Sequence, residues 1–581
     1  MHPTSSPPIP DEPLRPGSGG RSWIEPAIIV ALSTAASARV VLNDLVQDDI
    51  PVILRNPSVH QLGTMAAHFH QPYWPKPFSP YLYRPLSSVL FTLEWVAGHG
   101  HPWFLHGVSV VLYAAVCLAV LALCRRLLPP NAALAAAAVF AVHPLHVESV
   151  AGVVNQAELA AALCAVLAVC GYLDWRAAGS ALGGKVLALF ACAYAVTCLF
   201  KESGIVLPGL LAAAELTIVR DPRPLSVRFR QLWPLAATLV LVGAGFVLLR
   251  TLVLSSFAGT FAAEVFRNLS PGQRTLTMLG VVPEWARLFV WPAHLQVDYS
   301  PQEIVAATSW GWAQTVGLLI LAPTALLALI GVGRRWVGSF GVLWMVIAIF
   351  PVSNLLVPTG IALAERTLFL PSVGMVLVLG AGLAAMGPRL SSARPVVRFV
   401  AIGLLAAIVL AGAVRSALRH RDWQDTFTFW YRAVEDAPES YRARAALGGV
   451  MFTIRQNGTG ERLLREAIRL YPDGVLTYQI LGDRYRLAGL CAPAIATYNR
   501  ALELSPKAAD TRASLIACLL HDGRYAEAHD VAAAGIAEKT WPSIFRELKR
   551  TADSAMTASA PAGTVQLTAP DSASAGPPDR P

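Results

Sequence analysis

Long apolar segments recur between Trp23 and Val414, and they limit the possible folds of this chain more than any other feature. Many of them approach the roughly 20 residues that a helix needs to cross a lipid bilayer. The composition agrees, because 55% of the 581 residues are hydrophobic and 14% are charged, whereas soluble domains carry about 25% charged residues. Backbone groups inside lipid must bond within the chain, so each segment predicts a helix. We therefore predict an all-α, polytopic membrane protein.

About eleven segments have the apolarity of a membrane span. They are residues 23–42, 103–123, 132–150, 155–173, 184–200, 203–219, 232–253, 311–331, 337–352, 367–386 and 397–414. A further apolar piece at about 277–293 contains Pro283, Glu284, Arg287 and Pro292. Irregular backbone at membrane depth has to line an enclosed cavity, so we expect this piece to be re-entrant or interfacial.

Positively charged residues between the spans indicate how the spans are oriented. They are Arg125-Arg126, Arg176 with Lys185, Arg220 to Arg230, Arg334-Arg335 and Arg389 to Arg398. If the N-terminus lies inside, all of these loops face the cytoplasm, as the positive-inside rule requires. The C-terminus then lies outside, together with two long loops at about 43–102 and 254–310. If residues 277–293 crossed fully, several of the arginines would lie outside.

Charge and cysteine usage argue against two further classes of partner. The net charge of +9 comes largely from arginines in short loops between spans, so we expect no nucleic-acid partner. The eight cysteines are Cys117, Cys124, Cys164, Cys170, Cys192, Cys198, Cys491 and Cys518. Since none stands in a CxxC or zinc-finger spacing, we interpret them as small core residues and predict neither a disulfide framework nor a metal site.

Three positions in the last third of the chain recur every 34 residues. The series are Pro438, Pro472 and Pro506; Ala433, Ala467 and Ala501; and Leu447, Leu481 and Leu515. This is the period of the tetratricopeptide helix-turn-helix unit, in which a small Ala lets paired helices approach and Pro ends the second helix. We predict an α-solenoid of about three units, close to the minimum for a stable stack.

These patterns divide the chain into four parts. We predict a disordered cytoplasmic tail at 1–22, a membrane domain at 23–420, tetratricopeptide repeats at 421–540 and a second disordered tail at 541–581. The tails are rich in Pro, Gly, Ser and Ala, a composition that cannot bury enough apolar surface to fold.

The first outer loop carries adjacent acidic residues, Asp48 and Asp49. Neighbouring carboxylates at a membrane surface are costly, because each raises the pKa of the other. They could be solvated loop residues that cap helices. They could also include a general base that removes a proton from an acceptor hydroxyl.

Other polar residues lie near the predicted outer ends of the spans. They are Arg84, His143, His146, Glu148, Lys201, Glu202 and Arg366. His143, His146 and Glu148 could ligate a metal, but their spacing matches no zinc signature, so we favour hydrogen bonding around a polar cavity. Lys201 and Glu202 could be an ion pair at the membrane edge. Arg366, at the start of a span, could hold a phosphate through a bidentate contact.

Five stretches together resemble a known family. In order they are QDDIPVILRNPSV, YRPLS, FAVHPLHVESVAGVVNQAEL, FKES and AERTLFLPSVG, and the 34-residue repeat follows them. This order resembles the transmembrane and tetratricopeptide-repeat O-mannosyltransferases and their bacterial relatives. These belong to the type C glycosyltransferases, which use polyprenyl-phosphate-linked sugars. The resemblance extends from about Asp44 to Gly535.

The resemblance implies an active site at the outer membrane face. Asp48 or Asp49 would be the base, and a Ser or Thr hydroxyl of an exported protein would attack the sugar, with inversion. Arg366 would hold the lipid phosphate, with Arg84 and Lys201 as further candidates. The other expected residues of the donor site are Glu202, His143, His146 and Glu148. Mannose is the sugar associated with the family, and no cofactor is implied beyond the lipid-linked donor.

Two rival functions remain open on the sequence alone. The chain could modify a cell-envelope glycan instead of a protein, or it could be a non-catalytic scaffold that recruits proteins through its repeats. Its richness in Ala and Arg, with few lysines, is typical of a GC-rich bacterial genome. We therefore expect a multi-pass protein of a bacterial inner membrane, with the repeats on the periplasmic or extracellular side.

Overall fold

The computed structural model describes residues 23–557 apart from 76–81, 257–262, 333, 335 and 539–540. Every regular element in these residues is a helix, which confirms the all-α prediction. The chain divides into two compact units, residues 1–436 and 437–581. The expected tail at 1–22 lies outside the described residues.

Unit 1 contains the apolar helices. The first group is α1 (Ile24–Ser37), α2 (Pro85–Ala97), α3 (Pro102–Leu127), α4 (Pro130–Ala141), α5 (Val147–Ala151), α6 (Gln156–Ala177), α7 (Gly184–Phe200) and α8 (Leu207–Thr217). The second is α9 (Leu225–Leu254), α10 (Pro271–Val290), α11 (Trp312–Ile330), α12 (Val337–Ile349), α13 (Phe369–Ser392), α14 (Pro395–Arg419) and α15 (Thr426–Asp436).

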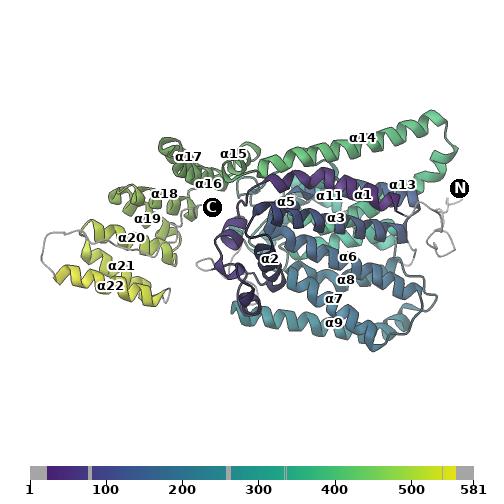
Figure 1. The fold of residues 1–581 in the computed structure, drawn as a ribbon, viewed down its shortest axis with the longest axis horizontal. Helices are drawn as coiled ribbons and strands as arrows, with labels where there is room; N and C mark the ends of the chain where they lie inside the picture. The colour runs from purple at the N-terminus through teal and green to yellow at the C-terminus, as the bar shows by residue number, and fades with distance from the viewer. Residues whose placement is uncertain are drawn as a thin grey trace. The chain divides into compact units, whose positions relative to one another are not determined.

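Short helical turns join several of these helices. They are η1 (Ala38–Leu42), η2 (Ile50–Leu54), η3 (Pro57–Val59), η4 (Leu62–His70), η5 (Pro144–His146), η6 (Val153–Asn155), η7 (Glu202–Val206), η8 (Glu264–Phe266), η9 (Phe350–Val352), η10 (Glu365–Leu368) and η11 (His420–Trp423). In Figure 1, α2 and the turns before it lie at one end of the long helices.

The long helices of unit 1 run side by side, as Figure 1 shows for α3, α6, α7 and α9. Small residues allow the closest approaches. Gly341 of α12 and Gly374 of α13 face each other, and a Cβ added to Gly341 would lie 2.6 Å from the carbonyl oxygen of Gly374. Close backbone contact of this kind is how helices pack in membranes.

Among the described residues, seven helices are long and apolar enough to cross a membrane, or eight if the bent pair Pro130–Ala141 and Pro144–Ala151 forms one span. These eight match eight of the predicted spans. The predicted spans at 184–200 and 337–352 are shorter apolar helices. At 203–219, α8 has 11 residues, too few to cross alone. The chain is a multi-pass membrane protein, and the count of eleven crossings stays a prediction.

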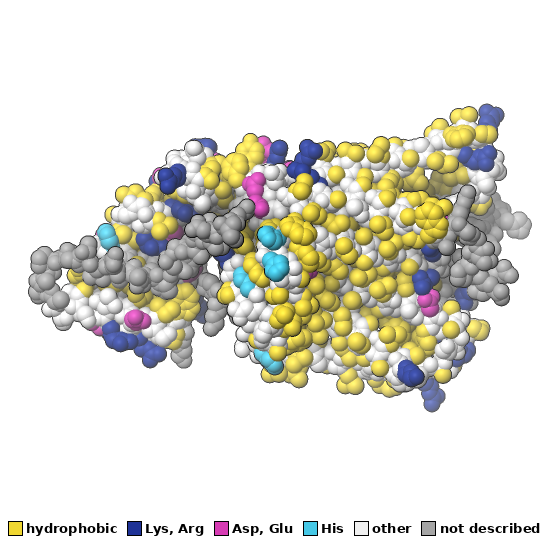
Figure 2. Space-filling view, viewed as in Figure 1, with side chains coloured by type: hydrophobic (Ala, Val, Ile, Leu, Met, Phe, Trp, Pro, Cys, Tyr) yellow, Lys and Arg dark blue, Asp and Glu magenta, His cyan; other side chains and the backbone are white. Residues whose placement is uncertain are grey.

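The surface of unit 1 suits lipid. Figure 2 shows hydrophobic side chains over most of the visible face of its helices, with Lys and Arg gathered toward the ends. α14 presents apolar side chains such as Phe399 and Leu410, which are 75% and 66% exposed. A large apolar face of this kind would be unfavourable in water. It is stable against the hydrocarbon interior of a bilayer, which is itself apolar.

The segment that we expected to be re-entrant or interfacial, 277–293, forms most of α10. The helix is continuous although Pro283 lies inside it, and Ser270 caps its start. α10 packs against α11. It is not among the described helices that are long and apolar enough to span a membrane. Glu284 and Arg287 on this helix form an ion pair of 2.5 Å.

Unit 2 is a stack of helix pairs. Its helices are α16 (Tyr441–Thr453), α17 (Asn457–Leu470), α18 (Val475–Leu487), α19 (Cys491–Leu504), α20 (Ala509–His521), α21 (Tyr525–Ala537) and α22 (Pro542–Thr557). The first helices of the pairs begin at Tyr441, Val475 and Ala509, which are 34 residues apart. The repeating residues Ala467 and Ala501 are fully buried between the helices of their pairs. The sequence period is therefore also the period of the solenoid.

The expected disordered tail at 541–581 is wrong for its first part. Pro542–Thr557 form α22, which packs against α21. The reason lies in the few apolar residues of this polar segment, because Phe545 and Ala552 fall on one helix face and are fully buried. A polar helix of this kind covers the open end of a repeat array. Residues 558–581 lie outside the described residues.

We expect Gly374→Leu to destabilise unit 1 strongly, because its side chain would push apart the touching backbones of α12 and α13. Overpacking of this kind costs about 1–3 kcal/mol or more. The matched control is Gly382→Leu on the same helix, where an added Cβ meets no atom within 4 Å. Thermal unfolding in lipid nanodiscs should show a lower midpoint only for Gly374→Leu, and equal midpoints would contradict the tight packing.

Candidate active site

A cavity of about 400 Å³ lies at the end of unit 1 where α6 and α13 begin and where α7 and α9 end. Five of the predicted site residues line it: Asp48, Arg84, Lys201, Glu202 and Arg366. They come from four separate segments of the sequence, since Lys201 and Glu202 are adjacent, so only the fold brings them together. Under the expected orientation, this end faces the outer side of the membrane.

The loop that carries Asp48 is held at several points. The backbone N–H of Asp44 donates to Gln424 (2.9 Å), and the side chain of Asn43 donates to the carbonyl of His420 (2.9 Å). Gln47, the residue before Asp48, has a φ of 51°, in the left-handed region that non-glycine residues rarely adopt. Such backbone strain is common at functional sites and persists only where the surroundings impose it.

Asp49 points away from the cavity and holds the loop in place. Its carboxylate is fully buried and accepts hydrogen bonds from the backbone N–H groups of Val153 (3.1 Å) and Val154 (2.8 Å). These N–H groups belong to η6, at the break in the helix before α6. Burial raises the pKa of Asp49 to about 7, although both hydrogen bonds oppose the rise. The adjacent acids therefore have different roles, one structural and one facing the cavity.

Asp48 combines partial burial with nearby charges of both signs. Burial raises the pKa of its carboxyl group above the ordinary value, and Glu148 adds to the rise. Arg366 and Arg84 oppose it by stabilising the carboxylate. A raised pKa makes a carboxylate a better proton acceptor, because the acid–base balance moves closer to neutral pH.

Three cations around the cavity are each paired with a carboxylate. Arg84 donates through Nε to Glu202 (2.8 Å), and its guanidinium also lies 5.2 Å from the centre of the Tyr73 ring. Lys201 pairs with Glu158, and Arg366 pairs with Glu148. These carboxylates offset much of the cost of placing positive charge in an apolar bundle and fix where each cation lies.

Glu148 positions Arg366 and is not itself part of the cavity lining. It is 3% exposed and contacts Arg366 twice, accepting from the backbone N–H (2.7 Å) and from the guanidinium. Glu148 therefore contacts Arg366, and Arg366 in turn lines the cavity. This arrangement ties α5 to η10, at the start of α13.

His143 and His146 are absent from the described lining of the cavity. His143 bonds through Nε2 to the carbonyl of Phe289 (3.1 Å). His146 lies between the Tyr113 hydroxyl (3.0 Å) and the Ser372 hydroxyl (2.9 Å). Both rings are buried and join helices within the bundle, which differs from the expected contact with the donor.

Arg250, Trp285 and Tyr73 are among the lining residues that the sequence did not predict. Arg250 interrupts the apolar sequence of α9 at the end that borders the cavity, and a charge in such a place is a functional signal in its own right. Trp285 lines the cavity from α10, and Tyr73 lines it from the segment between η4 and α2. No local pattern in the sequence distinguished these two aromatic residues from the many others in the chain.

A second cavity, of about 510 Å³, adjoins the first. Its wall is mainly apolar, and it shares Ile205 and Val247 with the polar cavity. Along α9 the lining runs from Phe229 to Val247, about 27 Å at 1.5 Å per residue. Val240 lines it and is 70% exposed, so the groove is open along its side. We call it the α8–α9 groove.

Comparison with known proteins gives the following result. No family model matches the chain. It is 25% identical to Protein O-mannosyl-transferase TMTC3 of Mus musculus over 514 residues, covering 83% of this chain and 55% of that protein. It is 26% identical to Protein O-mannosyl-transferase TMTC4 of Homo sapiens over 477 residues, covering 72% of this chain and 63% of that protein.

A further relative is Protein O-mannosyl-transferase Tmtc1 of Drosophila melanogaster, 27% identical over 510 residues, with 72% of this chain and 58% of that protein covered. The chain thus spans little more than half the length of these relatives. The comparisons confirm the resemblance to the transmembrane and tetratricopeptide-repeat O-mannosyltransferases.

We expect Asp49→Asn to destabilise the protein and Asp48→Asn to leave its stability nearly unchanged. An amide has one acceptor oxygen and an NH2 group that only donates, so Asn at position 49 can accept from only one of the Val153 and Val154 N–H groups. The second N–H group is then left buried without a partner. Such a loss costs about 1–3 kcal/mol. Thermal unfolding of both variants in nanodiscs at pH 6 measures the difference.

Repeating the Asp49 measurement at pH 8 tests the physical cause. Because the pKa of Asp49 is about 7 when folded, against an ordinary 3.8, the folded protein binds this proton more tightly than the unfolded chain does. Its contribution to stability is therefore present at low pH and is lost as pH rises through 7. The gap between wild type and Asp49→Asn should narrow at pH 8, and a wider gap would disprove this account.

Proposed function

We propose that this protein is a membrane glycosyltransferase that transfers mannose from a polyprenyl-phosphate donor to Ser or Thr hydroxyls of exported proteins. One observation carries the proposal: Asp48 shares a cavity with Arg84, Lys201 and Arg366, and that cavity adjoins the apolar α8–α9 groove. A base, a set of cations and an apolar channel are the parts that a lipid-phosphate sugar donor and a hydroxyl acceptor require. The names of the relatives favour the same chemistry.

Asp48 is the general base of the proposed reaction. Its carboxylate accepts the proton of the acceptor hydroxyl as the hydroxyl oxygen forms a bond to the anomeric carbon. The bond between that carbon and the phosphate oxygen breaks in the same step, and the sugar inverts. The raised pKa of Asp48 suits this role, because a stronger base pulls the proton more firmly.

Arg366 stabilises the departing lipid phosphate. Glu148 holds its guanidinium and its backbone N–H, so the cation is in place before the donor binds. A cation that needs no reorganisation stabilises developing charge best. Arg84 and Lys201, each fixed by a carboxylate of its own, would complete the positive side of the cavity.

The α8–α9 groove holds the prenyl chain of the donor. Its span of about 27 Å along α9 approaches the hydrocarbon thickness of roughly 30 Å. Phe229 and Val240, both in its wall, are 49% and 70% exposed, so a lipid can enter from the side. We place the cavity on the periplasmic or extracellular side of a bacterial membrane, where exported proteins are available as acceptors.

Asp48→Asn should lower the rate of sugar transfer by at least about a hundredfold, since general-base catalysis contributes roughly 10²–10⁴. The assay follows mannose moving from polyprenyl-phosphate mannose to a Ser/Thr peptide, with the enzyme in nanodiscs. Asp44→Asn is the matched control, because Asp44 holds its loop through backbone atoms. Full activity of Asp48→Asn would remove Asp48 as the base.

A comparison of cells that carry or lack the gene distinguishes the rival functions. Intact-mass analysis of exported proteins, with and without the gene, should show hexose units missing from the mutant strain. Hexose loss from an envelope glycan alone would replace the protein acceptor with a glycan. Failure of the donor to be consumed with any acceptor would favour the scaffold.

Gly243→Leu should raise the KM for a long-chain polyprenyl-phosphate donor by about tenfold and leave the KM for a short-chain analogue unchanged. An added Cβ at Gly243 would lie 2.9 Å from the Tyr194 hydroxyl, so a larger side chain must occupy the groove. The control is Gly245→Leu on the same helix, where no atom lies within 4 Å. Equal effects on both donors would exclude the groove as the site of the chain.

A further inference from the structure

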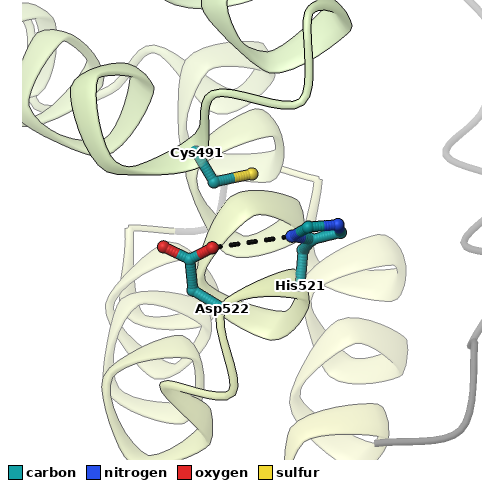
Figure 3. Close-up of side chains that lie close together, drawn as sticks. All are labelled: Cys491, His521 and Asp522. Carbon is teal, nitrogen blue, oxygen red and sulfur yellow. Dashed lines mark ion pairs between the residues drawn. The ribbon is translucent and has the colours of Figure 1, made fainter.

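Three residues with metal-ligating side chains meet in unit 2. The Cys491 Sγ, a ring nitrogen of His521 and a carboxylate oxygen of Asp522 all lie within 4.8 Å of one another. Figure 3 shows Cys491 reaching from one helix toward the pair formed by the other two. The ring of His521 and the carboxylate of Asp522 are 3.5 Å apart.

The ends of two helices hold these side chains. Cys491 is the first residue of α19, and His521 is the last residue of α20. Gly523, with a φ of 72°, ends α20 in the left-handed conformation, and the Asp522 N–H bonds back to Cys518 (3.0 Å). A helix N-terminus favours negative charge on the sulfur, whereas a helix C-terminus favours a bound cation. The C-terminal end of α20 therefore favours a cation at this point, whereas the positive end of α19 acts only through the sulfur.

The repeat itself supplies an internal comparison. The positions 34 residues earlier are Asn457, Leu487 and Ala488, at the equivalent junction between helix pairs. That junction forms with the same turn, since Gly489 has a φ of 73°. The fold thus needs no thiol, imidazole or carboxylate there.

Two arginines lie near this place, and each has a carboxylate beside it. Arg524 pairs with Glu527 (2.7 Å), and Arg486 lies 3.8 Å from Asp483. The side chains of His521 and Asp522 are 67% and 30% exposed, so an ion can reach them from solvent.

We propose that unit 2 binds a divalent cation of the zinc class through Cys491, His521 and Asp522, with the fourth position open to solvent. A thiolate, an imidazole and a carboxylate match the ligand preference of zinc. Tetrahedral ligands sit about 3.5 Å apart, so small side-chain rotations suffice. Binding forms three metal–ligand bonds and releases the Cys491 proton to solvent. This proposal is independent of sugar transfer.

The ion joins α19 to α20, and so it links two helix pairs of a short array. Each helix pair in a solenoid contacts only its neighbours, and a three-unit stack is close to the minimum. A ligand that binds only the folded state stabilises it by about 2.7 kcal/mol at a concentration one hundred times its Kd. The expected effect is a firmer junction between the second and third helix pairs.

The test uses the full chain in nanodiscs. The protein is stripped of metal with a chelator, loaded with zinc and desalted, and its zinc content is then measured. Elemental analysis should find about one zinc per chain more in the wild type than in His521→Gln or Asp522→Asn. Both replaced side chains are at least partly exposed, so these variants should fold. Cys192→Ser, which removes an exposed cysteine of unit 1, is the control and should match the wild type.

Hydrogen exchange supplies a readout that does not count metal. Zinc should slow exchange at the C-terminal turn of α20 and the first turn of α19 by about tenfold in the wild type. The same regions of His521→Gln should not respond. Equal zinc content in wild type and His521→Gln, or zinc uptake without protection at these turns, would overturn the proposal.

Discussion

Charged side chains in an apolar bundle need partners, and this need explains how the end of unit 1 that holds the cavity is built. Arg84, Lys201 and Arg366 each lie beside a carboxylate, from Glu202, Glu158 and Glu148. Removing one partner of a buried pair costs about 3–5 kcal/mol, because the other charge is left without compensation. Each pair also joins segments that are far apart in the sequence. The pairs therefore fix both the electrostatics of the cavity and the way its walls are held together.

Sequence patterns predicted the fold well where a single physical period determines it. Apolar length identified the membrane helices, and the 34-residue step identified helix pairs whose starts share that step. Some apolar helices are shorter than the thickness of a bilayer, such as α8 with 11 residues. The number of crossings therefore does not follow from counting apolar segments. α22 was missed because two buried side chains, Phe545 and Ala552, anchor a segment of otherwise polar composition.

The site was predicted in part, and the limits have a physical cause. Residue type and position suggested the cations and the acidic pair, but only coordinates show which acid faces the cavity. Asp48 and Asp49 are neighbours, and backbone N–H groups from a distant turn orient one of them inward. The metal-ligating residues of unit 2 show the same limit, since Cys491 and His521 are 30 positions apart and match no spacing rule.

The open side of the α8–α9 groove changes how the supply of any substrate that uses it should be described. Val240 and Phe229 leave the groove in contact with lipid, so a molecule can arrive by diffusion within one leaflet. Its effective concentration is then its mole fraction among the surrounding lipids, independent of the volume of water outside. Saturation would respond to membrane composition and fluidity, and dilution of the membranes in buffer would leave it unchanged.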